Sequence, residues 1–365
     1  MAKPVRVAHV VGKMVGGGVE QVVMNYYRHI DRSRVQFDFL VDSDSTLVPK
    51  DEIESLGGRV FEIPPYQHQI AYQRELIRLF RVECWPVVHS HVNALSVFPL
   101  RAAKRAGVPV RIAHSHSTAG KGEHAKNAMK TVLKKFANVY PTHRFACGKL
   151  AGDWLFGNRQ PYEIVRNAID LDRFSFDDSV RKSKRAELDI SESTLVVGHV
   201  GRFMPQKNHS FLIEAFDALR RERSDSMLLL AGEGELRRRM EVKVKEAGLE
   251  SCVRFLGQRS DIAELYQAFD VFALPSLYEG LCVVGVEAQR AGLPCVFADT
   301  ITREISLTDN AIFLPINNVE AWAEALQKRV ESREVEMSSF GEYNISAAAK
   351  RLESMYAELI GGIEC

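Results

Sequence analysis

Short apolar runs alternate with longer amphipathic or turn-forming stretches along the whole chain. In the first half the apolar runs are VRVAHVV, VQFDFLV, RVFEIP, VVHSHV and VRIAHSHS. Val, Ile and Phe fill them without strict alternation, as expected for strands of a parallel sheet that is covered on both faces. The pattern therefore predicts an α/β, doubly wound domain.

The alternation restarts after a polar segment, residues 167–188, which we interpret as a linker and an entry helix. Further strands are expected at TLVVGHVG, SMLLLAG, CVRFLG, VFALPS and LPCVFAD, with helical stretches between them. We predict two Rossmann-like domains, over residues 1–170 and 171–345, that face each other across a cleft and bind ligands at the carboxyl ends of their strands. Residues 346–365 are expected to form an amphipathic helix that packs back on the first domain.

Length and composition agree with two ordinary globular domains. The chain has 365 residues, of which 46% are apolar and 26% charged. Its six cysteines are scattered without metal-ligand spacing, which favours reduced thiols over a disulfide framework. No apolar run approaches the ~20 residues of a membrane-spanning helix, and the first residues do not resemble a signal peptide. We expect a soluble, cytoplasmic protein.

The net charge of +1 hides an asymmetry between the two halves. Residues 1–170 carry 24 Lys and Arg against 15 Asp and Glu, whereas residues 171–365 carry 24 against 32. A split of this kind at an expected domain boundary suggests that the two domains meet different partners.

Two carboxylates flank a predicted helix start in SLYEGLCVVGVEAQRAGLP, residues 276–294. The helix is expected to begin near Cys282, where its free N–H groups and dipole attract a phosphate. Gly280 lets the backbone approach a ligand closely, and Glu279 could accept hydroxyl groups from a sugar. Glu287, about one turn inside the helix, could accept the two hydroxyls of a ribose. The alternative is that Glu287 is a solvated helix residue and Glu279 merely helps the helix to start.

Two cations follow another strand in GRFMPQKN, residues 201–208. Arg202 and Lys207 flank a loop at the carboxyl end of the strand, where they could neutralise a diphosphate and the charge that develops as it leaves. Alone, Arg and Lys in a loop are more often solvated, but a helix start that attracts phosphate in the same half-sheet favours the functional interpretation.

Glycines gather after the first strand, in GKMVGGGVEQVV. A glycine-rich turn from strand to helix can enclose a phosphate or admit an acceptor, and a tight turn alone would also need glycine. The glycines fall at 12, 16, 17 and 18, so the stretch does not match the G-x-G-x-x-G fingerprint of dinucleotide-binding domains.

Histidines end two of the predicted strands, as His89 and His91 and as His114 and His116. A spacing of two puts each pair on one face of a strand, so a metal pair is conceivable. The sequence shows no third ligand at an obvious spacing, and we favour a metal-free site in which one histidine at a strand tip hydrogen-bonds a sugar or leaving group. At least two of the four are expected to be packed, hydrogen-bonded histidines.

Taken together, GGGVEQVV, GRFMPQKN and EGLCVVGVE resemble motifs of the retaining family 4 glycosyltransferases of GT-B fold, in the same order and each at a strand end. The resemblance covers nearly the whole chain, and RHIDRSRVQFDFLVDSD, LRAAKRAGVPVRIAHSHS and ADTITREISLTDNAIFLPI are similar to enzymes of bacterial exopolysaccharide or capsule synthesis. It implies transfer of a sugar from a nucleotide diphosphate, UDP in our interpretation, with retained anomeric configuration and no metal or other cofactor. The acceptor domain would be residues 1–170 and the donor domain residues 171–345.

The resemblance also implies roles for particular residues. His116 and Glu279 would be the catalytic pair near the donor sugar, and Glu287 would hold the ribose. The donor site would be completed by Gly17, Gly18, Arg202, Lys207, Gly280, Leu281, Cys282 and Val283. Cys282 departs from the family, which often has proline or glycine there.

Four other functions are alternatives to this interpretation. A GT-B nucleotide-sugar epimerase would need no acceptor, although the Glu-Gly stretch and the Arg/Lys loop argue against it. A catalytically silent partner subunit of another glycosyltransferase is suggested only by Cys282 and by Gly285 inside the helix. A nicotinamide dehydrogenase lacks its glycine fingerprint, and nothing beyond net charge supports nucleic-acid binding.

The basic first half contains a candidate membrane surface in residues 121–149. One predicted helix would carry an apolar stripe of Ala125, Met129, Val132, Leu133 and Phe136 and a basic stripe of Lys126, Lys130 and Lys134. Like charges so placed repel modestly, so such a face often has an anionic partner. We expect peripheral contact with the inner face of the membrane and a lipid-linked glycan acceptor, against the alternative of a solvated lysine face.

Overall fold

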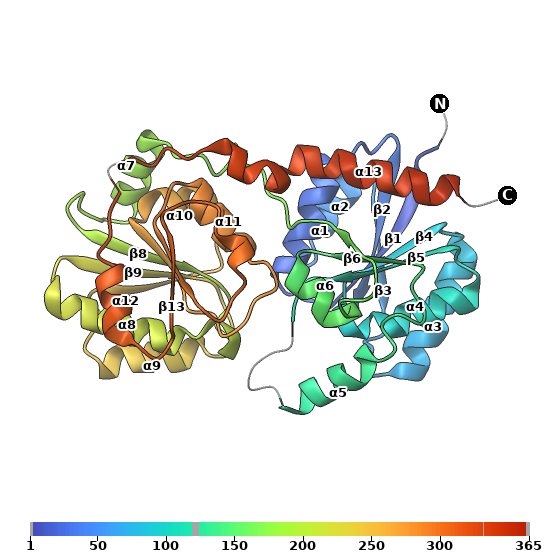
Figure 1. Cartoon of the computed structure of the whole chain (residues 1–365), viewed down its shortest axis with the longest axis horizontal. Coiled ribbons are helices and arrows are strands. Elements are labelled where there is room, and N and C mark those ends of the chain that lie inside the picture. Colours follow the sequence, from blue (N-terminus) through green and yellow to red (C-terminus); the bar gives the residue numbers. More distant parts are fainter. Residues whose placement is uncertain (1–2, 119–123, 331, 363–365) are drawn as a thin grey trace. The chain divides into compact units, whose positions relative to one another are not determined.

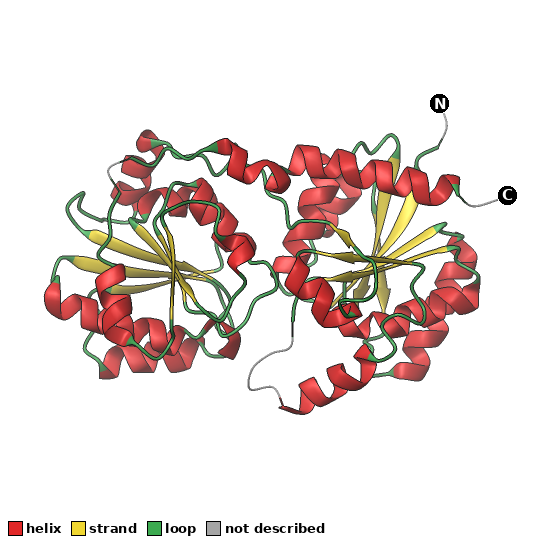
Figure 2. Ribbon diagram, in the orientation of Figure 1, coloured by secondary structure: helices red, strands yellow, loops and turns green. Residues whose placement is uncertain are grey.

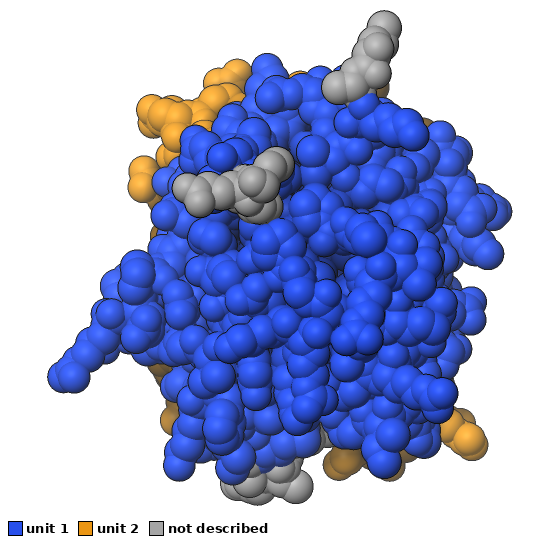
Figure 3. All heavy atoms as spheres, turned by 90° about the vertical axis from the view of Figure 1, so that its right-hand side faces the viewer, with its two compact units in different colours: residues 1–169, 342–365 blue, residues 170–341 orange. Residues whose placement is uncertain are grey.

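The computed structural model describes residues 3–118, 124–330 and 332–362. The chain divides into two compact units, which are coloured separately in Figure 3. Unit 1 comprises residues 1–169 and 342–365, and unit 2 comprises residues 170–341. In the described part of the chain, no helix is both long enough and apolar enough to cross a membrane.

Unit 1 is built on a parallel sheet of seven strands in the order β3-β2-β1-β4-β5-β6-β7 (Figures 1 and 2). Its strands are β1 (Val5–Gly12), β2 (Val35–Asp42), β3 (Arg59–Ile63), β4 (Val87–Ser90), β5 (Val110–Ser115), β6 (His143–Ala146) and β7 (Glu163–Ile164). The strand order reverses direction between β1 and β4, which are neighbours although β2 and β3 separate them in the sequence. Ligands of open α/β sheets bind at such a switch point.

Helices connect these strands. They are α1 (Gly18–His29), α2 (Lys50–Ser55), α3 (Gln69–Glu83), α4 (Val97–Ala106), α5 (His124–Lys134) and α6 (Lys149–Phe156). In α1 the residues Val22, Val23, Tyr26 and Tyr27 are buried, with the spacing of one helical face. The alternation of apolar runs and amphipathic stretches thus reflects a sheet covered by helices.

The last helix, α13 (Ile345–Gly361), belongs to unit 1 and packs on α1. Asn344 caps it, because its side-chain oxygen accepts hydrogen bonds from the N–H groups of Ser346 and Ala347. Residues 342–345, which the sequence analysis assigned to the second domain, lie in unit 1 instead. Their backbone pairs with Ile169, which donates to the Tyr343 carbonyl and accepts from the Ile345 N–H.

Unit 2 contains a parallel sheet of six strands in the order β10-β9-β8-β11-β12-β13. The strands are β8 (Leu195–Val200), β9 (Ser226–Ala231), β10 (Val253–Gly257), β11 (Val271–Leu274), β12 (Cys295–Ala298) and β13 (Ala311–Leu314). The helices are α7 (Asp178–Glu187), α8 (His209–Glu222), α9 (Arg237–Glu246), α10 (Ile262–Ala268), α11 (Val283–Arg290) and α12 (Val319–Ala325). Residues from α8, α9 and α12 share one core with the sheet, in which Trp322 is fully buried.

Candidate functional site

The two charged loops of unit 2 follow neighbouring strands. β8 pairs with β11 in parallel, so the loop after β8, residues 201–208, and the loop after β11, residues 275–282, leave the same edge of the sheet. They leave it at the switch point of the strand order, where α/β domains bind ligands.

An ion pair joins these loops. Lys207 Nζ lies 2.6 Å from Glu279 Oε1, and both side chains are largely buried, with exposed fractions of 15% and 10%. Gln206 donates to Glu279 Oε2 at 3.1 Å and to the Tyr278 carbonyl at 2.9 Å, while its own carbonyl accepts from the Leu277 N–H. A buried, charge-assisted network of this kind fixes the Lys207 ammonium and the Glu279 carboxylate side by side.

A third loop supports the loop that carries Lys207, and the sequence analysis did not single it out. Gly232 and Gly234 follow β9 with φ angles of +143° and +156°, a region that favours glycine. A Cβ atom on Gly232 would lie 2.2 Å from the Gly201 carbonyl oxygen, so the two backbones approach too closely for a side chain. The Phe203 N–H donates to the Glu233 carbonyl at 2.9 Å. The Gly-x-Gly spacing of residues 232–234, directly after a strand, is the sequence pattern from which this close backbone contact could have been predicted.

Arg202 lies in the same loop as Lys207 but is bound differently. Its guanidinium contacts the Met204 sulfur at 3.5 Å and forms no ion pair with any described residue. The structure therefore brings Lys207 and Glu279 together, while Arg202 has no carboxylate partner in the described part of the chain.

The helix start that the sequence predicted near Cys282 is confirmed. Cys282 is the N-cap residue of α11 and gives it no side-chain cap, so the helix entrance keeps donors for an anion. Burial raises the pKa of the Cys282 thiol to about 12, which keeps the sulfur neutral. Gly285 is explained by packing, because a Cβ atom there would lie 3.0 Å from Ile305 and 3.1 Å from Cys282 Sγ. It gives no support to a silent partner subunit.

The Glu287 side chain accepts a hydrogen bond from a tyrosine that the sequence did not single out. The Tyr266 hydroxyl, from α10, lies 3.0 Å from Glu287 Oε2 and 3.2 Å from the Val284 carbonyl. Burial raises the pKa of Glu287 to about 7, although the hydrogen bond from Tyr266 and the charge of Arg173 oppose this. Near neutral pH this carboxyl is thus poised between its charged and neutral forms. The hydrogen bond with Tyr266 favours a specific role for Glu287 over that of an ordinary solvated glutamate.

The glycine loop of unit 1 already holds a carboxylate. Glu20, in the first turn of α1, accepts hydrogen bonds from the N–H groups of Val15 and Gly16, at 3.0 and 2.6 Å. Gly16 has a φ of +79°, and a Cβ atom on Gly17 would lie 3.1 Å from Glu20 Oε1. Around Gly18 there is open space within 4 Å. Any anion bound here would therefore meet Gly18 at the start of α1, because the Glu20 carboxylate already lies against Gly17.

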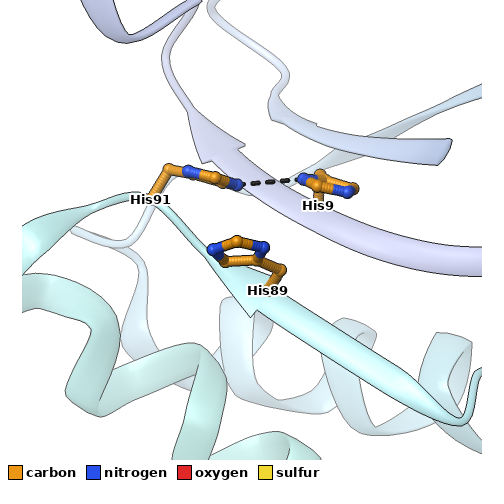
Figure 4. Close-up of side chains that lie close together, drawn as sticks. All are labelled: His9, His89 and His91. Carbon is orange, nitrogen blue, oxygen red and sulfur yellow. Dashed lines mark hydrogen bonds between the residues drawn. The ribbon is translucent and has the colours of Figure 1, made fainter. Parts of the chain in front are cut away.

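All four histidines at the strand ends are buried, together with a fifth, His9 on β1. The expectation that at least two of them are packed and hydrogen-bonded is confirmed. Figure 4 shows three of these rings, with a hydrogen bond of 2.9 Å between His9 Nδ1 and His91 Nε2. Burial lowers the pKa of His9 to about 3 and that of His116 to about 4, so these imidazoles are neutral at neutral pH.

Two triads of these rings have nitrogens within 4.8 Å of one another, a spacing that would admit a metal ion. The triads are His9, His89 and His91, and His91, His114 and His116. Their nitrogens already form hydrogen bonds with one another, and the metal-free interpretation stays a prediction.

Comparison with known proteins identifies the family. Residues 180–346 match the family described as glycosyl transferases group 1, and residues 17–167 match the glycosyl transferase 4-like domain. The putative glycosyltransferase EpsF of Bacillus subtilis is 37% identical, over 88% of this chain and 87% of EpsF. The chain belongs to the group 1 glycosyltransferases. The predicted family 4 membership and exopolysaccharide context are thereby supported.

Two further proteins are similar to this glycosyltransferase over nearly its whole length. The UDP-Gal:α-D-GlcNAc-diphosphoundecaprenol α-1,3-galactosyltransferase of Escherichia coli is 23% identical over 98% of this chain and 97% of its own. HepE of Anabaena, solved in complex with UDP-glucose, has a TM-score of 0.77 at 20% identity, over 98% of this chain and 100% of HepE. The GT-B fold predicted from the sequence is confirmed.

Proposed function

We propose that this glycosyltransferase moves a sugar from a UDP-sugar to a lipid-linked glycan in exopolysaccharide synthesis, with retention of the anomeric configuration. The observation that carries the donor side of the proposal is the buried Lys207–Glu279 pair, which lies at the switch point of unit 2 beside the entrance of α11. The Escherichia coli galactosyltransferase, whose name gives UDP-Gal as donor and a diphosphoundecaprenol-linked sugar as acceptor, supports both classes. HepE, solved with UDP-glucose, supports the donor class, and EpsF supports glycosyl transfer in general.

The chemistry requires stabilisation of the leaving group. Cleavage of the bond between the anomeric carbon and the phosphate oxygen leaves positive charge on the sugar and additional negative charge on the diphosphate. Lys207, Arg202 and the N–H groups at the start of α11, around Leu281 and Val283, would stabilise that negative charge. The acceptor hydroxyl would replace the diphosphate on the same face of the sugar and pass its proton to the departing phosphate oxygen, so no protein nucleophile is needed.

The two glutamates would hold the polar parts of the donor. Glu279 already forms an ion pair with Lys207, so a bound diphosphate would interact with the same Lys207 ammonium. The ion pair with Glu279 would weaken as a result. Hydrogen bonds from the sugar hydroxyls to the Glu279 carboxylate would compensate for part of that loss. Glu287, with a pKa of about 7, would become fully charged when the two ribose hydroxyls donate to it. His116, Gly17 and Gly18 lie in unit 1 and would contribute to the sugar and acceptor sites.

Thermal stability in a panel of nucleotide sugars tests the donor. UDP and its sugars are expected to raise the melting temperature of the full-length protein, because a ligand that binds only the folded state stabilises it by RT ln(1 + [L]/Kd). ADP and GDP sugars at the same concentration should have less effect. A stabilising UDP-sugar is then incubated with an undecaprenyl-diphosphate-linked acceptor, and the anomeric configuration of the product is read by NMR. An inverted product, or an epimer formed without acceptor, would contradict the proposal.

An exposed apolar strip on and after α5 supports the membrane part of the proposal. Met129, Val132, Phe136 and Val139 have exposed fractions of 38%, 56%, 46% and 52%. Leu133, which the sequence placed on the same stripe, packs against the core of unit 1 instead. The side chains of Ala125 and Lys126 lie outside the described residues, and the Lys134 ammonium lies 5.5 Å from the centre of the Trp154 ring. We propose that the apolar strip enters the membrane surface and that basic residues favour anionic lipid.

Vesicle binding tests this surface. Val132→Ser with Phe136→Ser is expected to weaken co-sedimentation with anionic vesicles about tenfold or more, because each exposed apolar side chain that becomes buried contributes roughly 1.5–3 kcal/mol. Ile70→Ser is the matched control, since Ile70 is 88% exposed on α3. Equal binding of all three proteins, or no preference for anionic over neutral vesicles, would refute membrane contact at this strip.

A further inference from the structure

The Tyr266 hydroxyl lies within hydrogen-bond distance of two oxygens of α11. Its oxygen is 3.0 Å from Glu287 Oε2 and 3.2 Å from the Val284 carbonyl oxygen. The Tyr266 side chain is fully buried, whereas Glu287 is only partly buried. All three residues belong to unit 2. The contact therefore joins the interior of this unit to a carboxyl group that keeps some access to solvent.

Aromatic rings and arginines fix the Tyr266 side chain. Three rings meet it in T-shaped contacts, with centroid distances of 5.9, 5.8 and 5.8 Å, from Phe174, Phe269 and Phe272. The guanidinium groups of Arg181 and Arg185 donate to carbonyl oxygens at the end of α10, at 2.9 and 3.0 Å. The Tyr266 hydroxyl is therefore held in one position, because these contacts fix both its ring and the end of its helix.

A hydroxyl in this position can bind Glu287 in either protonation state. A carboxylate only accepts hydrogen bonds, so Tyr266 donates to the charged form. A neutral carboxyl can donate to the Tyr266 oxygen, and the hydroxyl proton then goes to the Val284 carbonyl, which only accepts. Glu287 Oε2 stays against α10 in both forms, and Oε1 is left for a ligand.

The place of Glu287 in α11 suits the ribose of a nucleotide whose phosphates bind at the entrance of the helix. The entrance is at Cys282, the N-cap residue, and five residues of helix rise about 7.5 Å. Helical side chains lean towards the N-terminus, which brings the carboxyl group nearer to the entrance. This span is comparable to the one between the first phosphate of a nucleotide and its ribose hydroxyls.

We propose that Tyr266 is a positioning residue that holds Glu287 Oε2 against α10, so that Oε1 faces the nucleotide as a hydrogen-bond acceptor. Tyr266 acts only through Glu287 and touches no ligand itself. This inference rests on the proposed function only where it identifies the ligand of Glu287 as a ribose.

Carbon NMR of protein labelled at the glutamate carboxyl groups tests the contact without a ligand, and Glu287→Gln assigns the signal. Tyr266→Phe removes a donor to the carboxylate, so the titration midpoint of Glu287 is expected to rise by about half to one pH unit. The other titratable groups that act on the pair stay the same. Arg173 favours the carboxylate, and the Cys282 and Cys295 thiols are neutral because burial raises the pKa of each.

Tyr27→Phe is the matched control, since Tyr27 is a buried tyrosine of unit 1 whose hydroxyl bonds Gln36 at 2.8 Å. It should leave the Glu287 midpoint unchanged. A ring-fluorinated tyrosine in place of Tyr266 keeps the hydroxyl and makes it a stronger donor, so the midpoint should fall. An unchanged midpoint in folded Tyr266→Phe protein would overturn the inference. An unchanged midpoint with the fluorinated ring would do the same, even where the phenylalanine variant does not fold.

Binding of a UDP-sugar shows whether Tyr266 acts through Glu287. Its diphosphate, unlike that of UDP, does not titrate near neutral pH. Tyr266→Phe is expected to weaken binding about fivefold at pH 7, as for one hydrogen bond, and less at pH 8.5, where Glu287 is charged in both proteins. In a Glu287→Ala protein, Tyr266→Phe should cause no further loss, because residues that act as one unit are not additive. Additive losses would contradict the inference.

An analogue of the UDP-sugar that lacks both ribose hydroxyls separates this inference from the proposed function. It should bind the wild-type and Tyr266→Phe proteins equally, because it gives Glu287 no hydroxyl to accept from. A fivefold difference for this analogue as well would show that the ligand of Glu287 is not the ribose. If the Glu287 midpoint shifts as expected and no nucleotide sugar binds the wild-type protein, the proposed function fails and the positioning of Glu287 by Tyr266 stands.

Discussion

Replacing Lys207 with methionine is expected to lower the turnover of glycosyl transfer by about 10²–10³-fold, the usual loss when one group that stabilises developing negative charge is removed. Lys207 is a buried cation fixed by Glu279 at 2.6 Å, so its position requires no reorganisation when the diphosphate leaves. The variant keeps the aliphatic length of the side chain. Steady-state kinetics with the UDP-sugar found by thermal shift would measure the loss.

Loss of stability must be separated from loss of catalysis, because Lys207→Met leaves the Glu279 carboxylate buried and unpaired. Breaking one side of a buried ion pair costs roughly 3–5 kcal/mol, whereas removing both charges is often neutral. Lys207→Met with Glu279→Gln should therefore restore the melting temperature and remain inactive. Lys184→Met is the matched control, since Lys184 is a largely buried lysine of unit 2 that pairs with Asp261 at 2.7 Å. High activity of the double variant would show that Lys207 and Glu279 are not part of the donor site.

The sequence predicts which loops of this donor site leave the carboxyl ends of strands. A run of apolar residues followed by Arg202 and Lys207, or by Glu279, indicates which loop leaves the carboxyl end of a strand. Their pairing could not be predicted in the same way, because β9, β10 and the helices between them separate β8 from β11 in the sequence. Only the strand order brings Lys207 to Glu279. The Tyr266 hydroxyl on Glu287 depends likewise on how two helices pack.

The histidines show the same limit more sharply. Alternation in VVHSHV and VRIAHSHS correctly predicts that each pair shares one face of a strand. The Tyr356 hydroxyl, which lies 2.7 Å from His89 Nδ1 and 3.5 Å from His9 Nε2, comes from a residue 267 positions after His89 and 347 after His9. No local pattern marks a tyrosine on the last helix as part of a site on the first strands. Glu20 lies only four residues after Gly16, so the sequence places it close to the glycine loop. Only the structure shows that its carboxylate accepts hydrogen bonds inside that loop.

Unit 1 is expected to lose stability steeply as the pH falls below about 6.5. In the unfolded chain each imidazole binds a proton near pH 6.5, whereas His9 and His116 keep pKa values of about 3 and about 4 in the fold because they are buried. Between those limits acid stabilises only the unfolded state, so the free energy of unfolding falls by about 1.4 kcal/mol per pH unit for each such histidine. The loss levels off below the folded pKa values.

The Asp42 carboxyl of the same unit has the opposite effect on the pH dependence of stability. Burial raises the pKa of Asp42 to about 6, so it takes up a proton in the folded state first and stabilises the fold as the pH falls. His9, His116 and Asp42 together then leave a net loss of roughly 3 kcal/mol between pH 6.5 and 4.5. His89, His91 and His114, whose pKa values burial also lowers, add to it.

Hydrogen exchange of β1, β4 and β5 in the full-length protein, followed from pH 7.5 to 4.5 after correction for the intrinsic rate, measures this loss where it arises. His9→Gln should reduce the slope of the free energy of unfolding against pH by the contribution of one histidine, about 1.4 kcal/mol per pH unit. This reduction is expected whatever the substitution does to stability at pH 7.5. His68→Gln, at an exposed position, should leave the slope as it is. A flat stability profile above pH 4.5 would mean that the cluster takes up protons in the folded state.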